Sequence, residues 1–172
     1  NDFKKQEEEI CIVPEMNPTG DILSMAEVIN LLNELSKGEA VIVTDVGQHQ
    51  MVTCRYAKYK SSKSNITSGG LGTMGFALPA AIGASFGDSS RTIVAVIGDG
   101  GFQMTIQELG TIFQTRVPVK IVVLNNEFLG MVRQWQELFN QHRYSFVDIE
   151  SPDFVALAAA YSFRPPARLL YP

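Results

Sequence analysis

The sequence predicts an α/β fold of three layers, with helices on both faces of a parallel sheet. Three continuous runs of apolar and β-branched residues, at 40–44, 92–97 and 119–124, are typical of strands that are buried on both faces. Amphipathic helical patterns follow the second and third runs, as in the βαβ units of a parallel sheet. Such sheets bind ligands beyond the carboxyl ends of their strands, so the residues after each run are the first candidates for a site.

The composition excludes several other classes of protein. The chain has 172 residues, of which 45% are hydrophobic and 19% charged, the usual mixture of a globular domain. Its net charge of −4 argues against a nucleic-acid partner. Cys11 and Cys54 match neither a metal motif nor a disulfide framework. With no apolar run near the roughly 20 residues of a membrane helix and no signal peptide, we expect a cytoplasmic chain without a membrane partner.

The amino-terminal part divides into an expected linker and the start of a domain. Residues 1–20 are charged and then rich in proline, which favours a surface linker, and the domain is expected at 21–172. Apolar residues at helical spacing over 22–35, followed by Gly38, predict a helix and its end. The first predicted strand, 40–44, comes next and ends at Asp45.

Residues 70–75 spell a GxGxxG motif, which raises the possibility of a dinucleotide site. That fingerprint should follow an apolar strand, but residues 60–68 are almost entirely polar. The motif is therefore interpreted as a glycine-rich turn that enters a helix of small residues at 76–86, although closely spaced glycines also allow a ligand to approach.

The ends of the second and third predicted strands carry the chemistry. Asp99 lies between glycines at the start of a helix, where a carboxylate beside free N–H groups suits a divalent cation that bridges to a phosphate. Taken alone, it is more simply interpreted as a helix cap. Asn126 stands 27 positions later, at the end of the next strand. Two oxygen ligands from adjacent strand ends favour Mg²⁺ with a diphosphate.

Four separated blocks resemble the large catalytic subunit of acetolactate synthase (acetohydroxyacid synthase). Gly98-Asp99-Gly100 followed by Asn125-Asn126 is similar to the thiamine diphosphate signature, and residues 45–51, 67–83 and 124–135 agree with this family in order and spacing. The resemblance runs from about residue 21 to residue 160 and covers the carboxyl-terminal, diphosphate-binding third of such a subunit. It implies a thiamine diphosphate-binding fold and a fragment of a longer subunit.

The resemblance also implies residue roles. Asp99, the side chain of Asn126 and the backbone carbonyl of Phe128 would bind Mg²⁺. Gly72 and Met74 would contact the aminopyrimidine, with Met74 supporting the bent cofactor, and Met131 and Trp135 would line the substrate channel. Without the resemblance, Met74 and Trp135 would be read as packing residues. The full set of implied cofactor contacts is Val46, Gly47, Gln48, His49, Gly72, Met74, Gly98, Asp99, Gly100, Gly101, Asn126, Phe128, Leu129, Gly130 and Met131.

The implied activity is that of the whole subunit. It would decarboxylate pyruvate and transfer the two-carbon unit to a second 2-oxo acid, giving 2-acetolactate from pyruvate or 2-aceto-2-hydroxybutyrate from 2-oxobutyrate, in branched-chain amino acid biosynthesis. The glutamate that activates the cofactor and most of the FAD site would lie outside this chain, so no catalytic residue is assigned here and the fragment alone is expected to be inactive. The subunit would form a homodimer or homotetramer and could bind a regulatory small subunit.

Two departures from the family and two alternatives remain at this point. Val52 replaces a common aromatic residue, and residues 162–172, with two adjacent prolines, differ from the expected continuation. One alternative is another thiamine diphosphate-dependent decarboxylase, carboligase or oxidase. The other is a non-catalytic module for diphosphate binding or assembly.

Overall fold

The computed structural model describes residues 2–20 and 22–163, and its centre is a parallel sheet. Within these residues the sheet has four strands in the order β2-β1-β3-β4. The three predicted runs are parallel neighbours, with Val41 paired to Ile93 and Gly98 to Leu124, so the predicted fold class is confirmed. The strands are β1 (Val41–Thr44), β2 (Asn65–Thr67), β3 (Ile93–Gly98) and β4 (Lys120–Leu124).

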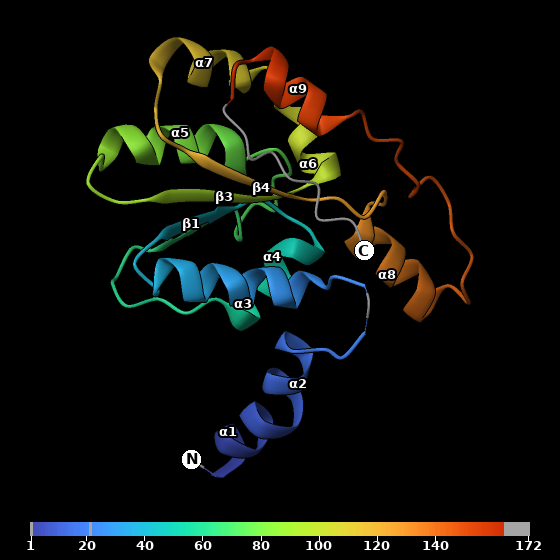
Figure 1. Ribbon diagram of the computed structural model, residues 1–172. Coiled ribbons are helices and arrows are strands. Elements are labelled where there is room, and N and C mark those ends of the chain that lie inside the picture. The colour runs from blue at the N-terminus through green and yellow to red at the C-terminus, as the bar shows by residue number, and fades with distance from the viewer. Residues whose placement is uncertain (1, 21, 164–172) are drawn as a thin grey trace.

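Helices cover both faces of this sheet (Figure 1). One face carries α3 (Met25–Ser36) and α4 (Gln48–Tyr56). The other face carries α5 (Ala77–Gly87), α6 (Asp99–Met104), α7 (Glu108–Thr115) and α9 (Phe154–Ala160). Helix α8 (Gly130–Phe139) projects from the edge at which the strands end. The result is the predicted three-layer arrangement.

Alternate residues of the strands build two separate cores. In β1, Val41 and Val43 pack toward α5, whereas Ile42 packs toward α3. In β3, Ala95 and Val96 divide between the two sides in the same way, and neither is accessible to solvent. Burial on both faces explains why these strands appear in the sequence as continuous apolar runs.

The helix predicted over 22–35 is α3, and its ends follow local rules. Ser24 accepts a hydrogen bond from the backbone N–H of Glu27, whose carboxylate in turn accepts one from the N–H of Ser24, which makes a complete capping box. The helix ends at Ser36, one residue before Lys37 adopts a left-handed conformation and two before Gly38. The predicted stop at Gly38 is therefore off by one residue, because Lys37 makes the first left-handed turn.

Two predicted segments differ from the structure. Residues 60–68 were expected to hold no strand, but Asn65–Thr67 forms the edge strand β2, paired with Ile42–Thr44. The helical pattern that follows the second predicted strand forms two helices, α6 and α7, because the chain leaves the helical conformation at Thr105. The Thr105 hydroxyl donates to the carbonyl of Gly75, which holds the break against the glycine-rich turn.

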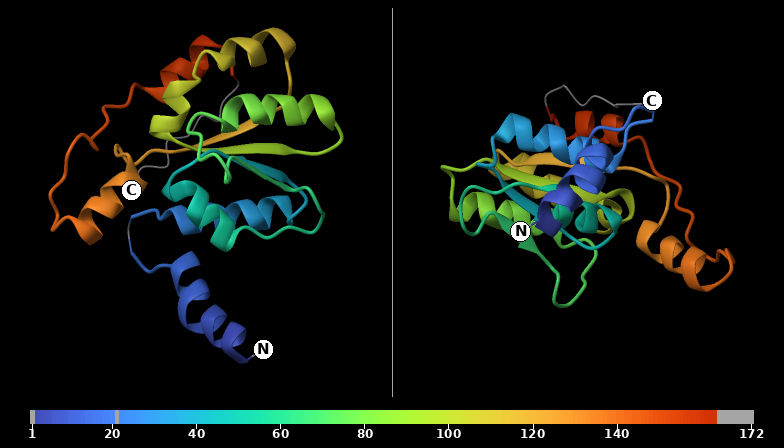
Figure 2. Two further views of the ribbon diagram at one scale, coloured as in Figure 1. Left: turned by 180° about the vertical axis from the view of Figure 1, so that it is seen from behind. Right: turned by 90° about the horizontal axis from the view of Figure 1, so that it is seen from below.

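The expected linker is also helical over most of its length. Residues 2–16 form α1 (Asp2–Glu7), a π-helical stretch (Glu8–Ile12) and α2 (Val13–Met16), which lie below α3 and α4 (Figures 1 and 2). Met16 is 4% exposed and joins the core on the α3 side. Arg55 forms ion pairs with Glu7 and Glu15. The charged and then proline-rich composition suggested a linker, yet the buried side chain of Met16 anchors the segment.

Two further sequence-based expectations concern the carboxyl-terminal tail and a membrane-spanning helix. Of the unusual tail 162–172, residues 164–172 lie outside the described residues. Among residues 2–20 and 22–163, no helix combines the length and the apolar character needed to cross a membrane.

Candidate cofactor site

A hollow opens at the carboxyl edge of the sheet, where β1, β3 and β4 end. Its walls come from the start of α4, the start of α6 and the loop into α8. Every residue predicted to contact the cofactor lines this hollow except Gly72. The complete lining is Met25, Val46, Gly47, Gln48, His49, Met74, Gly98, Asp99, Gly100, Gly101, Leu124, Asn126, Phe128, Leu129, Gly130, Met131 and Val132.

The differences from the predicted set are few. Gly72 lies outside the hollow, in the exposed turn before Met74. Trp135 is also outside it, 58% exposed, and stacks on Phe139 with ring centroids 4.9 Å apart. Met25, Leu124 and Val132 also line the hollow, but they were not predicted because apolar residues of these types are common in any core. The only signal for Val132 and Leu124 was their position beside predicted site residues.

Two glycines let the His49 ring reach the wall of the hollow. A Cβ atom on Gly47 would lie 2.8 Å from the imidazole Nδ1, and one on Gly98 would lie 2.9 Å from the same nitrogen. Real Cβ atoms do not approach so closely, so any other residue would displace the ring. His49 itself is 5% exposed and sits in the first turn of α4. The glycines after β1 and at the end of β3 therefore serve close packing around a histidine.

A third glycine stands where two side-chain amides meet. Asn126 donates from Nδ2 to Oε1 of Gln48 over 3.4 Å, and Gln48 donates to Gln134 over 3.2 Å. A Cβ atom on Gly130 would lie 2.8 Å from Asn126 Nδ2 and would overlap Gln48 Oε1. Gly130 is the first residue of α8, so the bare backbone at this helix start faces the hollow. This arrangement leaves N–H groups open to an anion.

Asp99 is buried, and its carboxyl accepts hydrogen bonds from Ser151 and from backbone N–H groups. It is 2% exposed and is the first residue of α6, while Gly98 occupies the cap position, so Asp99 is not the helix cap. Its Oδ2 accepts a hydrogen bond from the Ser151 hydroxyl over 3.3 Å. Burial raises the pKa of the Asp99 carboxyl, and hydrogen bonds from backbone N–H groups, including that of Gly100, oppose this rise only in part. A cation beside Asp99 would offset the cost of its buried charge.

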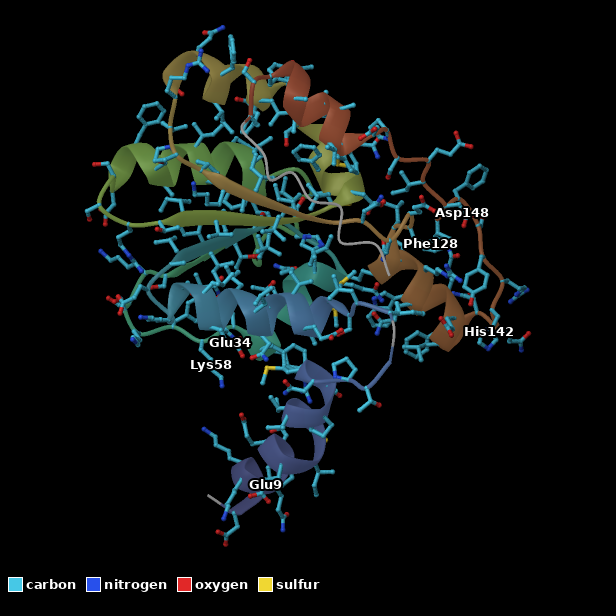
Figure 3. The ribbon with its side chains drawn as sticks, viewed as in Figure 1. Glu9, Glu34, Lys58, Phe128, His142 and Asp148 are labelled. Carbon is cyan, nitrogen blue, oxygen red and sulfur yellow. The ribbon has the colours of Figure 1, made fainter. Side chains whose placement is uncertain are left out.

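Hydrogen bonds hold the loop after β4, which carries Asn126 and Phe128, in place. The N–H of Phe128 donates to Asn126 Oδ1 over 3.2 Å, which orients the amide. Phe128 forms an isolated antiparallel bridge with Asp148, and the two residues lie side by side at the base of α8 (Figure 3). The N–H of Leu129 donates to the Val147 carbonyl over 2.7 Å. The returning segment thus braces the loop that carries Asn126.

The residues fit an oxygen-bound divalent cation better than a nitrogen- or sulfur-bound one. Within residues 2–20 and 22–163, no three His, Cys, Asp or Glu side chains gather as a metal site. The candidate ligands are instead one carboxylate, on Asp99, one amide oxygen, on Asn126, and the carbonyl of Phe128, all on the lining of one hollow. Oxygen ligands with few carboxylates are typical of Mg²⁺ that shares its coordination with substrate phosphates.

Comparison with known proteins decides the family. The family described as "Thiamine pyrophosphate enzyme, C-terminal TPP binding domain" matches residues 45–169. The chain belongs to this family. The fold, a parallel sheet between helix layers, agrees with this thiamine pyrophosphate-binding domain.

The individual relatives that match this chain are acetolactate synthase large subunits. The chain is 50% identical over 140 residues to the acetolactate synthase large subunit of Lactococcus lactis subsp. lactis. The aligned residues are 80% of this chain and 24% of the relative. The chain is 46% identical over 146 residues to the acetolactate synthase isozyme 2 large subunit of Escherichia coli, covering 84% of this chain and 27% of the relative. The chain therefore spans about a quarter of the length of the curated relatives it matches. Over that length, its thiamine pyrophosphate-binding domain is similar to acetolactate synthase large subunits.

Proposed function

We propose that this chain holds the diphosphate end of thiamine diphosphate, together with Mg²⁺, as part of an acetolactate synthase large subunit. The observation that carries the proposal is the convergence of residues 46–49, 98–101 and 126–131 on one hollow at the carboxyl ends of three parallel strands. Ligands of parallel sheets bind at this edge. The identity to acetolactate synthase large subunits of two bacteria supports the same assignment.

In this proposal Asp99, Asn126 and the Phe128 carbonyl hold Mg²⁺. The Asp99 carboxylate supplies the only formal charge among them, and its burial makes a cation favourable there. Asn126 contributes the amide oxygen that the Phe128 N–H already orients. The backbone N–H groups at Gly101 and Gly130 bind the diphosphate oxygens, because they lie at helix starts and have no side chain in the way. Gly100, whose N–H donates to Asp99, leaves room beside them.

The other residues of the hollow orient the cofactor and keep water out. Met74 is half-buried and lines the hollow from the glycine-rich turn, where its flexible thioether can support an aromatic ring. The apolar part of the lining is completed by Leu124, Leu129, Met131 and Val132. When bound, thiamine diphosphate supplies the nucleophilic carbon that allows a 2-oxo acid to lose CO₂ and pass its two-carbon unit onward. Gly72 and Trp135 are proposed to act only in the complete subunit.

The size of the hollow supports the proposal that this chain builds one part of the cofactor site. Its volume is about 90 Å³, whereas pockets that enclose a small molecule measure roughly 300–1,000 Å³. That volume suits a diphosphate and its metal. The remaining walls, the glutamate that activates the cofactor and the FAD site are assigned to parts of the subunit outside this chain.

The whole-subunit properties follow from the same assignment. Pyruvate and 2-oxobutyrate are the proposed substrates, with 2-acetolactate and 2-aceto-2-hydroxybutyrate as products. A homodimer or homotetramer, a regulatory small subunit and a cytoplasmic location belong to this proposal as well.

Titration calorimetry tests the proposal. Thiamine diphosphate is added to the 172-residue chain with Mg²⁺ and, separately, with a chelator. We expect binding that requires Mg²⁺, and we expect inorganic pyrophosphate to compete, while thiamine without phosphates does not. Binding of thiamine as tight as that of thiamine diphosphate, or binding unaffected by the chelator, would contradict the proposal. The same chain should form no acetolactate from pyruvate.

A further inference from the structure

We infer that Asp45 is a positioning residue of the cofactor site, whose carboxylate fixes the His49 ring and the Met74–Gly75 turn relative to each other. The inference rests on the proposed function, since it names a residue that would prepare the same hollow for its ligand. Asp45 does not line the hollow itself. It acts through residues that do.

Both carboxylate oxygens of Asp45 are engaged, each with a different segment. Asp45 directly follows β1 and is inaccessible to solvent. Its Oδ1 pairs with Nε2 of His49, the second residue of α4. Its Oδ2 accepts a hydrogen bond from the backbone N–H of Gly75 over 2.8 Å. One buried side chain therefore joins the end of β1, the start of α4 and the glycine-rich turn.

The pairing with Asp45 fixes the orientation of the His49 ring. Because Nε2 is held by Asp45, Nδ1 is the nitrogen that remains. It packs against Gly47 and Gly98, the two glycines whose Cβ atoms would lie within 3 Å of it and which line the hollow. A histidine held by a carboxylate at one nitrogen has a fixed orientation and tautomer. Asp45 thus fixes the ring around which Gly47 and Gly98, two glycines of the lining, pack.

The second contact sets the position of Met74. Gly75 has a φ of +78°, a left-handed conformation that favours glycine, and its N–H points to Asp45. Met74, the residue before it, lines the hollow. A Cβ atom on Gly101 would overlap Asp45 Oδ2, so the start of α6 also depends on the place of this carboxylate. Three walls of the hollow meet at Asp45.

Thr44 provides a matched control. It precedes Asp45 in the chain, is likewise inaccessible, and donates a hydrogen bond to the Thr67 hydroxyl over 3.0 Å. It does not line the hollow. Replacing Thr44 with valine removes a buried hydrogen bond at the same strand end without touching His49 or Gly75.

The first test compares Asp45→Asn with Thr44→Val in binding of thiamine diphosphate with Mg²⁺. The asparagine side chain has one acceptor oxygen and one donor nitrogen, so it can keep only one of the two bonds. We expect Asp45→Asn to weaken binding by about 10- to 100-fold, the range typical of residues that orient ligand-binding side chains. Thr44→Val should change the affinity by less than about twofold at a temperature where both variants are folded. Equal effects of the two substitutions would overturn the inference.

The second test asks whether Asp45 acts through His49. The probe is inorganic pyrophosphate with Mg²⁺, which has no pyrimidine and so reports the His49 end of the hollow alone. The loss of affinity caused by Asp45→Asn should be several-fold smaller in a His49→Gln background than in the wild type. Additive losses would mean that Asp45 does not act through the histidine.

A third measurement needs neither a variant nor a bound cofactor. Long-range ¹H–¹⁵N spectra of the wild-type chain should show a proton on His49 Nε2, protected from exchange with water. A His49 whose proton sits on Nδ1, with Nε2 bare, would overturn the inference even if the cofactor binds. Conversely, a wild-type chain that binds neither thiamine diphosphate nor pyrophosphate would refute the proposed function, while this spectrum would still decide whether Asp45 holds His49.

Discussion

The side-chain amide of Asn126 donates to Oε1 of Gln48, and Gly130 lies directly against this pair. Gln48 belongs to α4, which follows β1, whereas Asn126 lies beyond β4. The two strands are separated by β3 in the sheet. The contact therefore closes the hollow across the end of the central strand, and a residue that intrudes on it should damage binding before it damages the fold.

Gly130→Ala tests this closure. The new methyl group would push Gln48 and Asn126 aside, because its Cβ would overlap Gln48 Oε1. We expect thiamine diphosphate affinity in Mg²⁺ to fall at least roughly tenfold, which is ~1.4 kcal/mol. The midpoint of thermal unfolding should change little, since alanine favours a helix over glycine. Calorimetry and thermal unfolding measure the two effects.

Gly83→Ala is the control for that substitution. Gly83 lies within α5, and a Cβ atom there would meet nothing within 4 Å. Alanine should raise the free energy of unfolding by about 0.5–1 kcal/mol and leave the affinity unchanged. Loss of binding in Gly83→Ala as large as in Gly130→Ala would show that the effect is not local to the hollow.

Asp99→Ala separates a metal ligand from a helix-capping residue. If Asp99 binds Mg²⁺, the Mg²⁺-dependent affinity for thiamine diphosphate should fall by several kcal/mol, at least about a hundredfold, with little loss of stability. Asp153→Ala is the comparison, because Asp153 does cap α9 and accepts hydrogen bonds from the N–H groups of Val155 and Ala156. That variant should lose about 1 kcal/mol of stability and keep its affinity. The opposite pattern would remove Asp99 from the metal site.

The pH dependence of stability without metal follows from the burial of Asp99. Burial raises the pKa of this carboxyl above its ordinary value of 3.8. The protonated form is then favoured by folding, so its contribution is fully present below pH 3.8 and is lost as the pH rises through the raised value. Relative to Asp99→Asn, the metal-free wild type should lose stability across that window. Urea unfolding of both proteins at several pH values measures the difference, and a difference that does not vary with pH would contradict the prediction.

The amino-terminal helices are expected to contribute to stability through one side chain. Met16 is 4% exposed and packs near Ile29 and Tyr56. Met16→Ala should lower the free energy of unfolding by about 2 kcal/mol or more. Ile10→Ala, at a residue 73% exposed, should change it by less than about 0.5 kcal/mol. If Met16→Ala changed the free energy of unfolding as little as Ile10→Ala, residues 2–16 would not be anchored through Met16 and would behave as a linker.

The parts of the fold that the sequence predicted share one physical property. Strands β1 and β3 were recognisable because burial on both faces requires continuous apolar runs. Strand β4 has a similar apolar run, although it lies at the edge and is mostly half-buried. Strand β2 has only three residues and lies at the edge, so Ile66 was its single apolar signal. The break between α6 and α7 depends on the Thr105 bond to Gly75, a contact between segments 30 residues apart that no local pattern encodes.

The site was predictable to the extent that its residues belong to motifs. Asp99 and Asn126 were predicted because their spacing matched one crossover of a parallel sheet, whereas the glycines of the candidate site were implied by the resemblance to the family. The role of Asp45 could not be found in this way, since it depends on two contacts, with His49 and Gly75, that only the folded chain brings together. Apolar wall residues such as Met25 have no signal that distinguishes them from core residues.

The most direct test of the central claim locates the bound ligand. Backbone ¹H–¹⁵N spectra of the chain are recorded as Mg²⁺ and thiamine diphosphate are added together. The account predicts the largest shifts at the amides of Gly47, Gly100, Gly101 and Gly130, with no shifts when Mg²⁺ is withheld. A second hollow at the opposite edge of the sheet, lined by Leu35, Arg91 and Lys120 among others, serves as the internal comparison. Shifts centred on that hollow, or the same shifts without Mg²⁺, would contradict the account.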